Sequence, residues 1–481
     1  MQGSETEASP DATASLTLGV AAAATALVLM AFTMPLGLLA TIVPDLSAGP
    51  LGQSWILSSM SVGLAGSLLV TGSVADDLGR RRIFLGGLSV FTAGSFAGAV
   101  APSVLALCLA RAAQGVGGAA VLAAALSLIA HAFPPGPSRV HATGVWGAML
   151  GAGIAVGPLG GALVAELGSW RTSYAVLGLL SAIALVPAAR GLTESRATER
   201  RPIDPVGAAL LAAGLTALTA GVVQGNASEW LAAAPLAALG LAALSLVAFT
   251  AWELRSREPL FDVRLMARPK FAGALLGSFV LGVAVLSFMS YSMTFMATAL
   301  GASVIGAAVW ALPWSGVAFF VSIRARALGR FLSPRVQTVI GLVICAAGLL
   351  AMRGLSADSS SAHLVPGFAV LGVGTGLLNA TLAQAAVSDV PASRSGMGAG
   401  ASNTARYLGA ALGVPLVVGL LNTGTDSRLA DGQAAAAAAT GAMDAVLLVV
   451  ALIALAGAAL TFILLRPARP AAPSPTRKVM A

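Results

Sequence analysis

Long apolar runs, separated by short polar or charged breaks, occupy almost the whole chain. A helix needs about 20 consecutive apolar residues to cross the hydrocarbon core of a membrane, and fourteen runs approach or exceed this length. They predict membrane-spanning helices over residues 16–43, 53–75, 83–100, 103–131, 140–166, 172–190, 205–224, 230–253, 271–299, 303–323, 336–353, 362–388, 395–422 and 441–465. We therefore expect an all-α polytopic membrane protein with fourteen spans, while twelve or thirteen spans remain possible because boundaries between neighbouring runs shift by several residues.

The composition supports this expectation and excludes other classes of protein. Hydrophobic residues make up 57% of the 481 residues and charged residues only 10%, whereas a soluble domain carries about 25% charged residues. A soluble enzyme, a nucleic-acid-binding protein and a disordered scaffold are thereby excluded. The lipid bilayer, not nucleic acid, is the expected surrounding of this chain.

Basic residues are distributed unevenly between alternate loops, which predicts the orientation. Cytoplasmic loops of membrane proteins carry an excess of Lys and Arg. With the N-terminus inside, 22 of the 27 basic residues fall in inner loops and only Arg171, Arg353 and Arg428 in outer ones. We expect both termini in the cytoplasm, and the multi-pass chain in the plasma membrane of a bacterium (the inner membrane).

The spans are expected to form groups of six, two and six. A polar tail over residues 1–15, expected to be disordered, precedes a first six-helix bundle over 16–190. Charged cytoplasmic segments and two extra helices fill 191–270, a second six-helix bundle follows over 271–465, and a basic tail ends the chain over 466–481. Two matched halves are typical of secondary transporters, whose substrate site lies between them at mid-membrane.

The loop between the second and third spans has a distinctive spacing of small and charged residues. Residues 72–82 read GSVADDLGRRR, with Gly72, Asp76, Gly79, Arg80 and Arg81 at fixed intervals. Gly72 is expected to let two helix ends approach closely, and Gly79 to form a tight turn. Asp76 could remain ionised beside a helix N-terminus or an arginine.

Two arginines are expected near the middle of the membrane. At 1.5 Å per residue, Arg111 lies about 12 Å along the fourth span, with Gln114 one turn further, and Arg406 lies about 16 Å from the inner end of the thirteenth. A charge at this depth costs at least about 2.5 kcal/mol. Both side chains should therefore face the interior of the bundle or a water-filled cavity.

The fifth span carries regularly spaced glycines. Gly144, Gly153, Gly157 and Gly161 recur along it, and Pro158 follows the third of them. Small residues on one face allow close contact between helices, and a proline kink can be tolerated where neighbouring helices satisfy the freed backbone groups.

On these segments the sequence resembles the major facilitator superfamily, and its six-two-six pattern resembles the fourteen-span drug:proton antiporter branch. The resemblance implies that residues 72–82 steady one face of an alternating-access cycle, that Arg111 is associated with proton coupling, and that the fifth span carries the glycine pattern of antiporters. Four positions depart from the family pattern: Asp77, Ala162, Arg330, and Ala31, near which members of the branch usually have an aspartate.

No acidic residue lies in the middle of any predicted span. Proton coupling would therefore have to use Glu166 or Asp45 near the outer end of the first half, and the substrate is expected to be amphiphilic and neutral or anionic. Arg111, Gln114 and Arg406 are the expected transport residues. Residues that could line the substrate cavity are Phe32, Met34, Trp146, Tyr291, Trp314, Asn379, Asn403 and Tyr407.

The expected function is proton-coupled efflux of small drug-like or antibiotic-like compounds by a monomer. Two alternatives remain: a metabolite uniporter or importer of the same fold, and, more remotely, an integral-membrane enzyme. No cluster with the spacing of a metal site appears in the sequence, and no cofactor is expected beyond the proton gradient. Cys108 and Cys345 lie in apolar runs and are expected to be free and buried.

Overall fold

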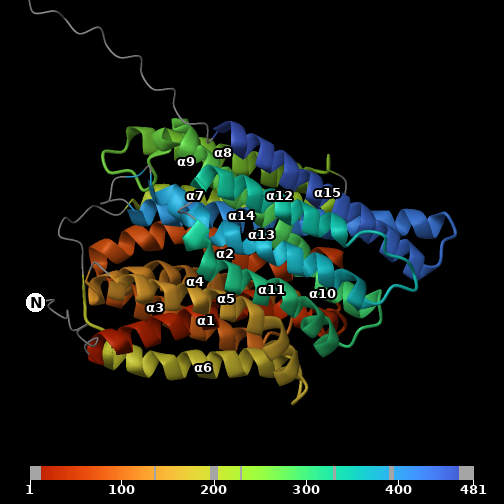
Figure 1. Ribbon diagram of the computed structural model, residues 1–481, viewed down its shortest axis with the longest axis horizontal. Coiled ribbons are helices and arrows are strands. Elements are labelled where there is room, and N and C mark those ends of the chain that lie inside the picture. Colours follow the sequence, from red (N-terminus) through yellow and green to blue (C-terminus); the bar gives the residue numbers. More distant parts are fainter. Residues whose placement is uncertain are drawn as a thin grey trace, which may run out of the picture.

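The computed structural model describes residues 12–134, 137–195, 204–227, 230–328, 332–388, 390 and 395–464, and within them the chain is entirely helical. The α-helices are α1 (Ala12–Asp45), α2 (Pro50–Leu78), α3 (Arg80–Ala99), α4 (Val104–Ala132), α5 (Pro137–Ala165), α6 (Trp170–Gly191), α7 (Pro205–Ala227), α8 (Ala233–Arg255), α9 (Pro269–Val280), α10 (Ser287–Thr298), α11 (Val304–Leu328), α12 (Pro334–Ala351), α13 (Val365–Ser388), α14 (Ser395–Ala430) and α15 (Ala435–Leu464). Figure 1 shows most of them running side by side along the long axis of the molecule.

Three short helical segments complete this set. The 3₁₀ turns η1 (Val263–Ala267) and η3 (Ser361–Leu364) precede α9 and α13, and the π-helical segment η2 (Leu281–Leu286) joins α9 to α10. Because η2 continues both neighbours, residues Pro269–Thr298 form one long helix with a widened turn in its middle.

The number of clear membrane spans is lower than the fourteen that the sequence predicts. Twelve helices in the described ranges are long and apolar enough to cross a membrane, and thirteen if the bent α5 is counted as one span. α5 bends by 45° between Ile154 and Val156, close to Pro158. α12 contributes a shorter apolar helix over Arg335–Ala351. The helix itself begins and ends two residues earlier than the predicted span.

The ends of the chain lie largely outside the described residues. α1 begins at Ala12, so residues 12–15 of the expected disordered tail are helical, and residues 1–11 are not described. The expected basic tail over 466–481 and Arg330, in the second copy of the 72–82 loop, also lie outside the described ranges.

The helices pack mainly within the first six and within α9–α15. In the first group, α4 packs against α2 and α3, α1 against α5, and α6 against α3. In the second, α13 packs against α11 and α12, and α15 against α12 and α14. The two groups meet where α2 contacts α14, where α5 contacts α11, and where α1 contacts α10 and α11.

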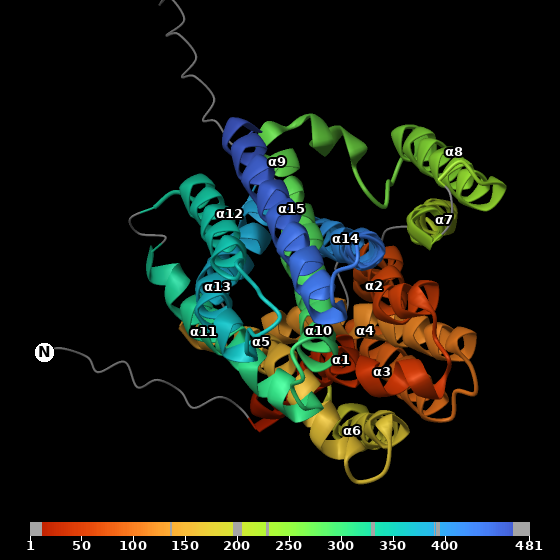
Figure 2. The same ribbon diagram turned by 90° about the vertical axis from the view of Figure 1, so that its right-hand side faces the viewer.

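The α7–α8 hairpin lies beside one of these junctions. α7 packs against α8 and also contacts both α2 and α14. Figure 2 shows the hairpin at the edge of the molecule, next to α2 and α14 and away from α5, α6 and α11. α7 therefore covers the junction of α2 with α14, whereas the α5–α11 junction has no comparable cover in the described part of the chain.

Gly79 forms the tight turn between α2 and α3 that the sequence predicts. Its φ is +116°, a backbone conformation that only glycine adopts readily. The Glu194 carboxylate accepts a hydrogen bond from the amide of Arg81 at 3.1 Å and lies 3.7 Å from the Arg82 Nε. It occupies the space beside Gly79, because an added Cβ would lie 2.5 Å from its Oε1. A carboxylate is favourable at this position, the N-terminus of α3.

Gly72 does not have the role expected of it. A Cβ added there would meet no described heavy atom within 4 Å, so no second helix of the described ranges approaches this glycine. It lies in α2 at a half-exposed position, where small size is not needed for packing. The side chains of Asp76 and Asp77 are outside the described part of the structure.

These two glycines predict opposite effects of alanine. Gly79→Ala should lower the thermal unfolding midpoint of the detergent-purified protein, because backbone strain of about 1–3 kcal/mol is added to a clash with Glu194. Gly72→Ala, the matched control, should leave the midpoint unchanged or raise it slightly, since alanine is favoured over glycine inside a helix by about 0.5–1 kcal/mol. Equal midpoints for the two variants would contradict this account.

Candidate functional site

The Arg111 side chain is completely buried inside the first group of helices. Its exposed fraction is 0%, and it donates hydrogen bonds to three different helices. Nε bonds the Ile56 carbonyl of α2 at 2.6 Å, and Nη1 bonds the Ala31 carbonyl of α1 at 3.2 Å and the Tyr174 hydroxyl of α6 at 3.3 Å. The arginine thus lies in the interior of the bundle, one of the two positions that the sequence allows, and does not line a water-filled cavity.

The Ala31 carbonyl is available to Arg111 because of Pro35. In a helix the carbonyl of residue 31 would accept a bond from the amide of residue 35, but proline has no N–H. Arg111 supplies the missing donor. Ala31 is also the position near which the sequence resemblance implies an aspartate. In this chain a backbone carbonyl therefore binds the arginine where a carboxylate was expected.

The charge of Arg111 has no acidic partner in the described part of the chain. Its three acceptors are neutral, and it takes part in neither the Arg82–Glu194 nor the Arg171–Asp45 ion pair. Nη2 of Arg111 has no hydrogen-bond partner, and one turn along α4 the same is true of Oε1 of Gln114. Gln114 is also fully buried, and its Nε2 donates to the Ser95 hydroxyl at 3.0 Å.

A second proline-freed carbonyl lies on α5. Pro158 leaves the carbonyl of Ile154 without its helical donor, and the Thr33 hydroxyl of α1 lies 3.2 Å from it. The same hydroxyl is 3.0 Å from the Leu29 carbonyl in its own helix. Thr33 can therefore donate either to α1 or to the kink of α5.

The glycines of α5 bring this helix against α1. A Cβ at Gly153 would lie 2.5 Å from the Ala26 carbonyl oxygen, and one at Gly161 would lie 2.5 Å from Cγ of Met34. Gly157, between them, directly faces the Thr33 hydroxyl. The close helix contact that the spacing predicts is therefore present, and its partner is α1. Gly144 belongs to the same helix, but its surroundings are not described.

Arg406 lies in a polar cluster near the junction of the two groups of helices. It donates from Nη1 to Oδ1 of Asn379 on α13 at 3.2 Å and from Nη2 to Oδ1 of Asn403 one turn earlier on α14. Its guanidinium carbon is 5.4 Å from the ring centre of Tyr407. Three of the expected transport and cavity residues are thus brought together around Arg406, which is half-buried.

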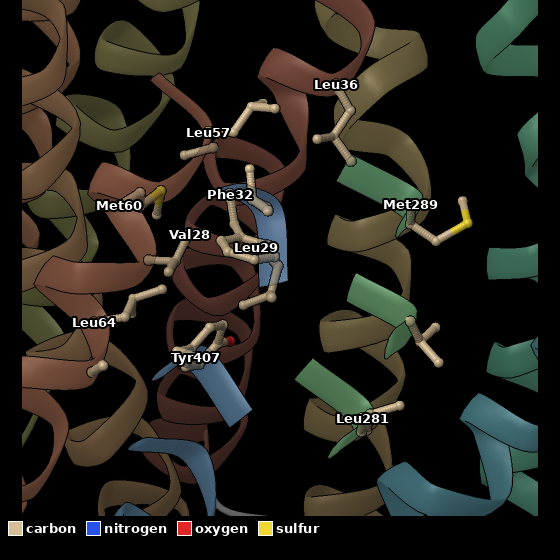
Figure 3. Packing of buried hydrophobic residues seen from close by; sticks show 14 of the residues in the cluster. Val28, Leu29, Phe32, Leu36, Leu57, Met60, Leu64, Leu281, Met289 and Tyr407 are labelled. Atoms are coloured by element: carbon tan, nitrogen blue, oxygen red, sulfur yellow. The ribbon is translucent and has the colours of Figure 1, made fainter. Parts of the chain in front are cut away.

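Tyr407 connects this cluster to α1. Its ring packs edge-on against Phe32 with the ring centres 5.3 Å apart, and both side chains are buried. Figure 3 shows Phe32 and Tyr407 close together, with Leu57, Met60 and Leu64 approaching from one side. The expected cavity residues Phe32 and Tyr407 therefore meet across the junction of α1 and α14.

The π-helical segment η2 packs against the backbone of α14 at the level of Arg406. A Cβ at Gly282 would meet the Arg406 carbonyl oxygen, and one at Gly409 would meet that of Phe279. Both positions require glycine, because backbone atoms occupy the space that a side chain would need. Widened π-turns are frequent at functional sites.

The other expected cavity residues make contacts within one group of helices. Trp146 donates to the Thr25 hydroxyl of α1 at 2.9 Å, and Trp314 donates to the Thr375 hydroxyl of α13 at 3.2 Å. Met34 packs against Gly161, as described above. Tyr291 is buried on α10, with 8% of its surface exposed. In this structure Met34, Trp146 and Trp314 therefore serve as packing residues.

The two carboxylates proposed for coupling have different surroundings. Glu166 follows the end of α5 and is exposed. Oδ2 of Asp45 accepts bonds from Nη1 of Arg171 at 2.5 Å and from the indole of Trp170 at 3.0 Å. Asp45 thus ties the end of α1 to the start of α6. In the described part of the chain no group of three or more His, Cys, Asp or Glu residues could hold a metal ion. Cys108 and Cys345 are free and buried, as the sequence predicts.

Sequence reasoning missed three residues of these networks. Glu194 looked like one charge among many in a cytoplasmic segment, and Tyr174 and Thr33 looked like ordinary positions in apolar spans. The prolines gave a signal for two of these contacts, because each proline frees the carbonyl four residues earlier. Pro158 frees the Ile154 carbonyl that Thr33 contacts, and Pro35 frees the Ala31 carbonyl that Arg111 contacts.

The described helices define a multi-pass membrane protein with two buried or half-buried arginines and an interior glycine-rich helix contact. The chain belongs to the Major Facilitator Superfamily, whose family model matches residues 21–414. It is accordingly a membrane transporter and not an enzyme.

Several characterised relatives are drug or antibiotic transporters. The chain is 33% identical over 395 residues to the cephamycin export protein CmcT of Amycolatopsis lactamdurans, covering 80% of this chain and 81% of that protein. It is 30% identical to the multidrug resistance protein Stp of Mycobacterium tuberculosis, with 79% and 71% covered, and 30% identical to the multidrug efflux pump LfrA of Mycolicibacterium smegmatis, with 80% and 75% covered.

The fold also matches a solved transporter structure. A bacterial homologue of the human lysosomal transporter Spinster, in an inward-facing and unoccupied conformation, superposes with a TM-score of 0.68. The match covers 95% of this chain and 98% of that one at 15% identity. At this identity the likeness concerns the fold alone.

The Arg111 contacts predict that charge alone cannot replace this side chain. Arg111→Lys should lower the thermal unfolding midpoint more than Tyr174→Phe, because a lysine cannot reach acceptors on three helices at once. Each buried acceptor left unsatisfied costs about 1–3 kcal/mol, whereas Tyr174→Phe removes a single bond worth about 1 kcal/mol. The two midpoints should be measured in the same detergent. A lysine variant as stable as the unmodified protein would show that the three-helix contact is dispensable.

Proposed function

We propose that this protein is a proton-coupled exporter of small amphiphilic compounds, such as drugs or antibiotics, which works by alternating access. Family membership and relatives named as multidrug or antibiotic exporters support this function. The observation that carries the proposal within the structure is the polar cluster around Arg406. It lies on α14 and α13, next to the place where α14 packs against α2 and where Tyr407 contacts Phe32 of α1, between groups of helices that would rock against each other.

The chemistry of this cluster favours a neutral or anionic substrate. Arg406 offers a positive charge and the two asparagines offer neutral amides, while Phe32 and Tyr407 provide aromatic surface. A buried cationic substrate would need a counter-charge. No acidic side chain hydrogen-bonds to this cluster in the part of the chain that the structure describes.

For the topology we propose fourteen spans with both termini in the cytoplasm of a bacterium. Each predicted span coincides with a helical segment, and the two that do not qualify alone are the bent α5 and the short α12. This arrangement corresponds to the fourteen-span drug:proton antiporter branch, with six-helix bundles over 16–190 and 271–465 and the α7–α8 hairpin between them. We propose that the transporter acts as a monomer.

The roles that follow for the residues of the 72–82 loop and of α5 are also proposals. Residues 72–82, with Gly79, Arg80, Arg81 and Asp76, would steady one state of the cycle, and the α1–α5 glycine contact would transmit the movement. Glu166 remains a candidate proton carrier. It is exposed, and it takes part in neither the Arg82–Glu194 nor the Arg171–Asp45 ion pair.

A second function, transport of a metabolite without proton coupling, is favoured by one observation. Arg111 binds the Ala31 carbonyl where related transporters usually have an aspartate, so the titratable partner of this arginine is missing. A uniporter or importer needs no such group.

The polar cluster predicts a loss of efflux in a targeted variant. In an efflux-deficient host exposed to a broad compound panel, Arg406→Gln should reduce export of the recognised compounds about tenfold, which corresponds to about 1.4 kcal/mol of lost interaction. Arg428→Gln is the matched control on the same helix. Nη1 of Arg428 donates to the nearby Gly424 carbonyl of α14 itself, so this variant should transport normally. Strong export of a permanent cation such as ethidium by the unmodified protein would contradict the proposed substrate class.

Proton coupling is tested separately in reconstituted vesicles. An inwardly acidic vesicle lumen should drive accumulation of a recognised compound, and a protonophore should abolish it. Transport that follows only the compound's own gradient, at any imposed pH difference, would replace the exporter proposal with the uniporter alternative.

A further inference from the structure

Two acidic side chains are buried in the described part of the chain, and they lie together. Asp204, which precedes α7, is 9% exposed, and Glu253, three residues from the end of α8, is 3% exposed. Neither belongs to the arginine networks described above. They join the ends of α7 and α8 that the orientation of basic residues predicts to be cytoplasmic.

Asp204 is fully engaged as a hydrogen-bond acceptor. Its Oδ1 accepts from the amide of Gly207 at 2.8 Å, and the indole Nε1 of Trp252 lies 2.9 Å from Oδ1 and 2.8 Å from Oδ2. The first contact caps the N-terminus of α7. The second attaches this cap to α8.

Glu253 has one satisfied oxygen and one unsatisfied oxygen. Oε2 accepts from the amide of Phe261 at 3.2 Å, in the segment that leads to α9. Oε1 is buried and has no hydrogen-bond partner. Leaving a buried charged acceptor unsatisfied is strongly unfavourable.

The unsatisfied oxygen of Glu253 and an oxygen of Asp204 lie beside the same glycine. A Cβ added at Gly207 would lie 2.6 Å from Oε1 of Glu253 and 2.8 Å from Oδ2 of Asp204. Both oxygens therefore border the same small space at the first turn of α7, which the glycine leaves open. Two ionised carboxylates this close repel each other, whereas one proton between them would turn Oε1 into a donor and supply its missing bond.

The described surroundings of the pair contain two arginines and a further aspartate. Glu253 borders a small polar cavity of about 140 Å³ together with Arg257, Asp262 and Arg264. Both arginines are exposed, and neither forms an ion pair with Glu253 within the described ranges. Oδ1 of Asp262 accepts from the Arg264 amide at 3.2 Å, and α7 has no charged residue in its first turns.

We propose that Asp204 and Glu253 share one proton and form a proton-binding site that holds the α7–α8 hairpin together. The proton lies between Oε1 of Glu253 and Oδ2 of Asp204, while Oε2 of Glu253 holds the Phe261 amide. Loss of the proton to cytoplasmic water leaves two adjacent carboxylates, whose repulsion loosens the cap of α7 and the segment that leads into α9. The hairpin thereby responds to cytoplasmic pH.

Infrared difference spectroscopy of the purified protein tests the shared proton directly. Raising the pH from about 5 to about 9, well above the pKa of an exposed carboxyl group of about 4, should remove the carbonyl stretch of a protonated carboxyl group late in the titration. Glu253→Gln should lack this signal, and Glu258→Gln, an exposed glutamate five residues along the chain, should retain it. A late signal that persists in Glu253→Gln and Asp204→Asn would overturn the proposal.

Thermal unfolding over the same pH range tests the consequence. A proton bound more tightly in the folded state stabilises it at low pH, and this stability is lost as the pH rises. The midpoint of the unmodified protein should therefore fall by a few degrees relative to that of Glu253→Gln, whose amide keeps a donor toward Asp204. Parallel pH profiles for the two proteins would overturn the proposal. Both measurements are made without substrate, so their outcome is independent of whether the protein exports drugs.

Discussion

The bond between the Arg111 guanidinium and the Ala31 carbonyl is the contact on which the architecture of the first six helices depends. Pro35 removes a backbone donor from the middle of α1, and a carbonyl left without a donor in an apolar interior would be strongly unfavourable. Arg111 repairs this defect and at the same time bonds α2 and α6. The charged Arg111 side chain, whose burial costs much free energy, thus lies where the Ala31 carbonyl of α1 lacks a backbone donor.

The same principle links α1 to α5. Each of these helices contains a proline that frees a carbonyl, and in each case the donor comes from another helix, Arg111 for Ala31 and Thr33 for Ile154. α1 and α5 are also helices through which the first group meets α10 and α11, whereas α14 meets it mainly through α2. Two of the three helices that carry the main contacts between the groups therefore have a carbonyl whose missing backbone donor is supplied by another helix.

Much of the fold could be predicted from the sequence, because the membrane imposes one simple rule on every span. Apolar length placed all the helices, and Gly79 and the α5 glycines were identified from the backbone freedom and close packing that their spacing indicates. The bend of α5 and the early end of α12 could not be predicted from apolar length, because the hydropathy of a segment does not determine where a helix bends or ends. The role of Gly72 was wrong because a glycine in a pattern does not reveal whether a neighbour exists.

The site was predictable to a smaller degree. A charge in a span indicates an interior position, which holds for Arg111 and Arg406, and the neighbours Asn403 and Tyr407 followed from their proximity in sequence. Which aromatic residues face the junction depends on the rotation of each helix, so Phe32 meets Tyr407 whereas Trp146 and Trp314 bond within their own groups. Glu194 and the Asp204–Glu253 pair arise from contacts between segments far apart in the chain, for which a single sequence holds no signal.

The position of α7 makes the molecule asymmetric about its central junction. Since α7 touches α2 and α14 together, those two helices cannot part without one of them sliding along α7. No described helix outside the two groups of helices bridges α5 and α11 in the same way. If the two groups of helices rock against each other, the movement would therefore be smallest at the α2–α14 junction, which α7 covers, and largest at the α5–α11 junction. A lipid-soluble molecule that enters from the bilayer would therefore enter between α5 and α11.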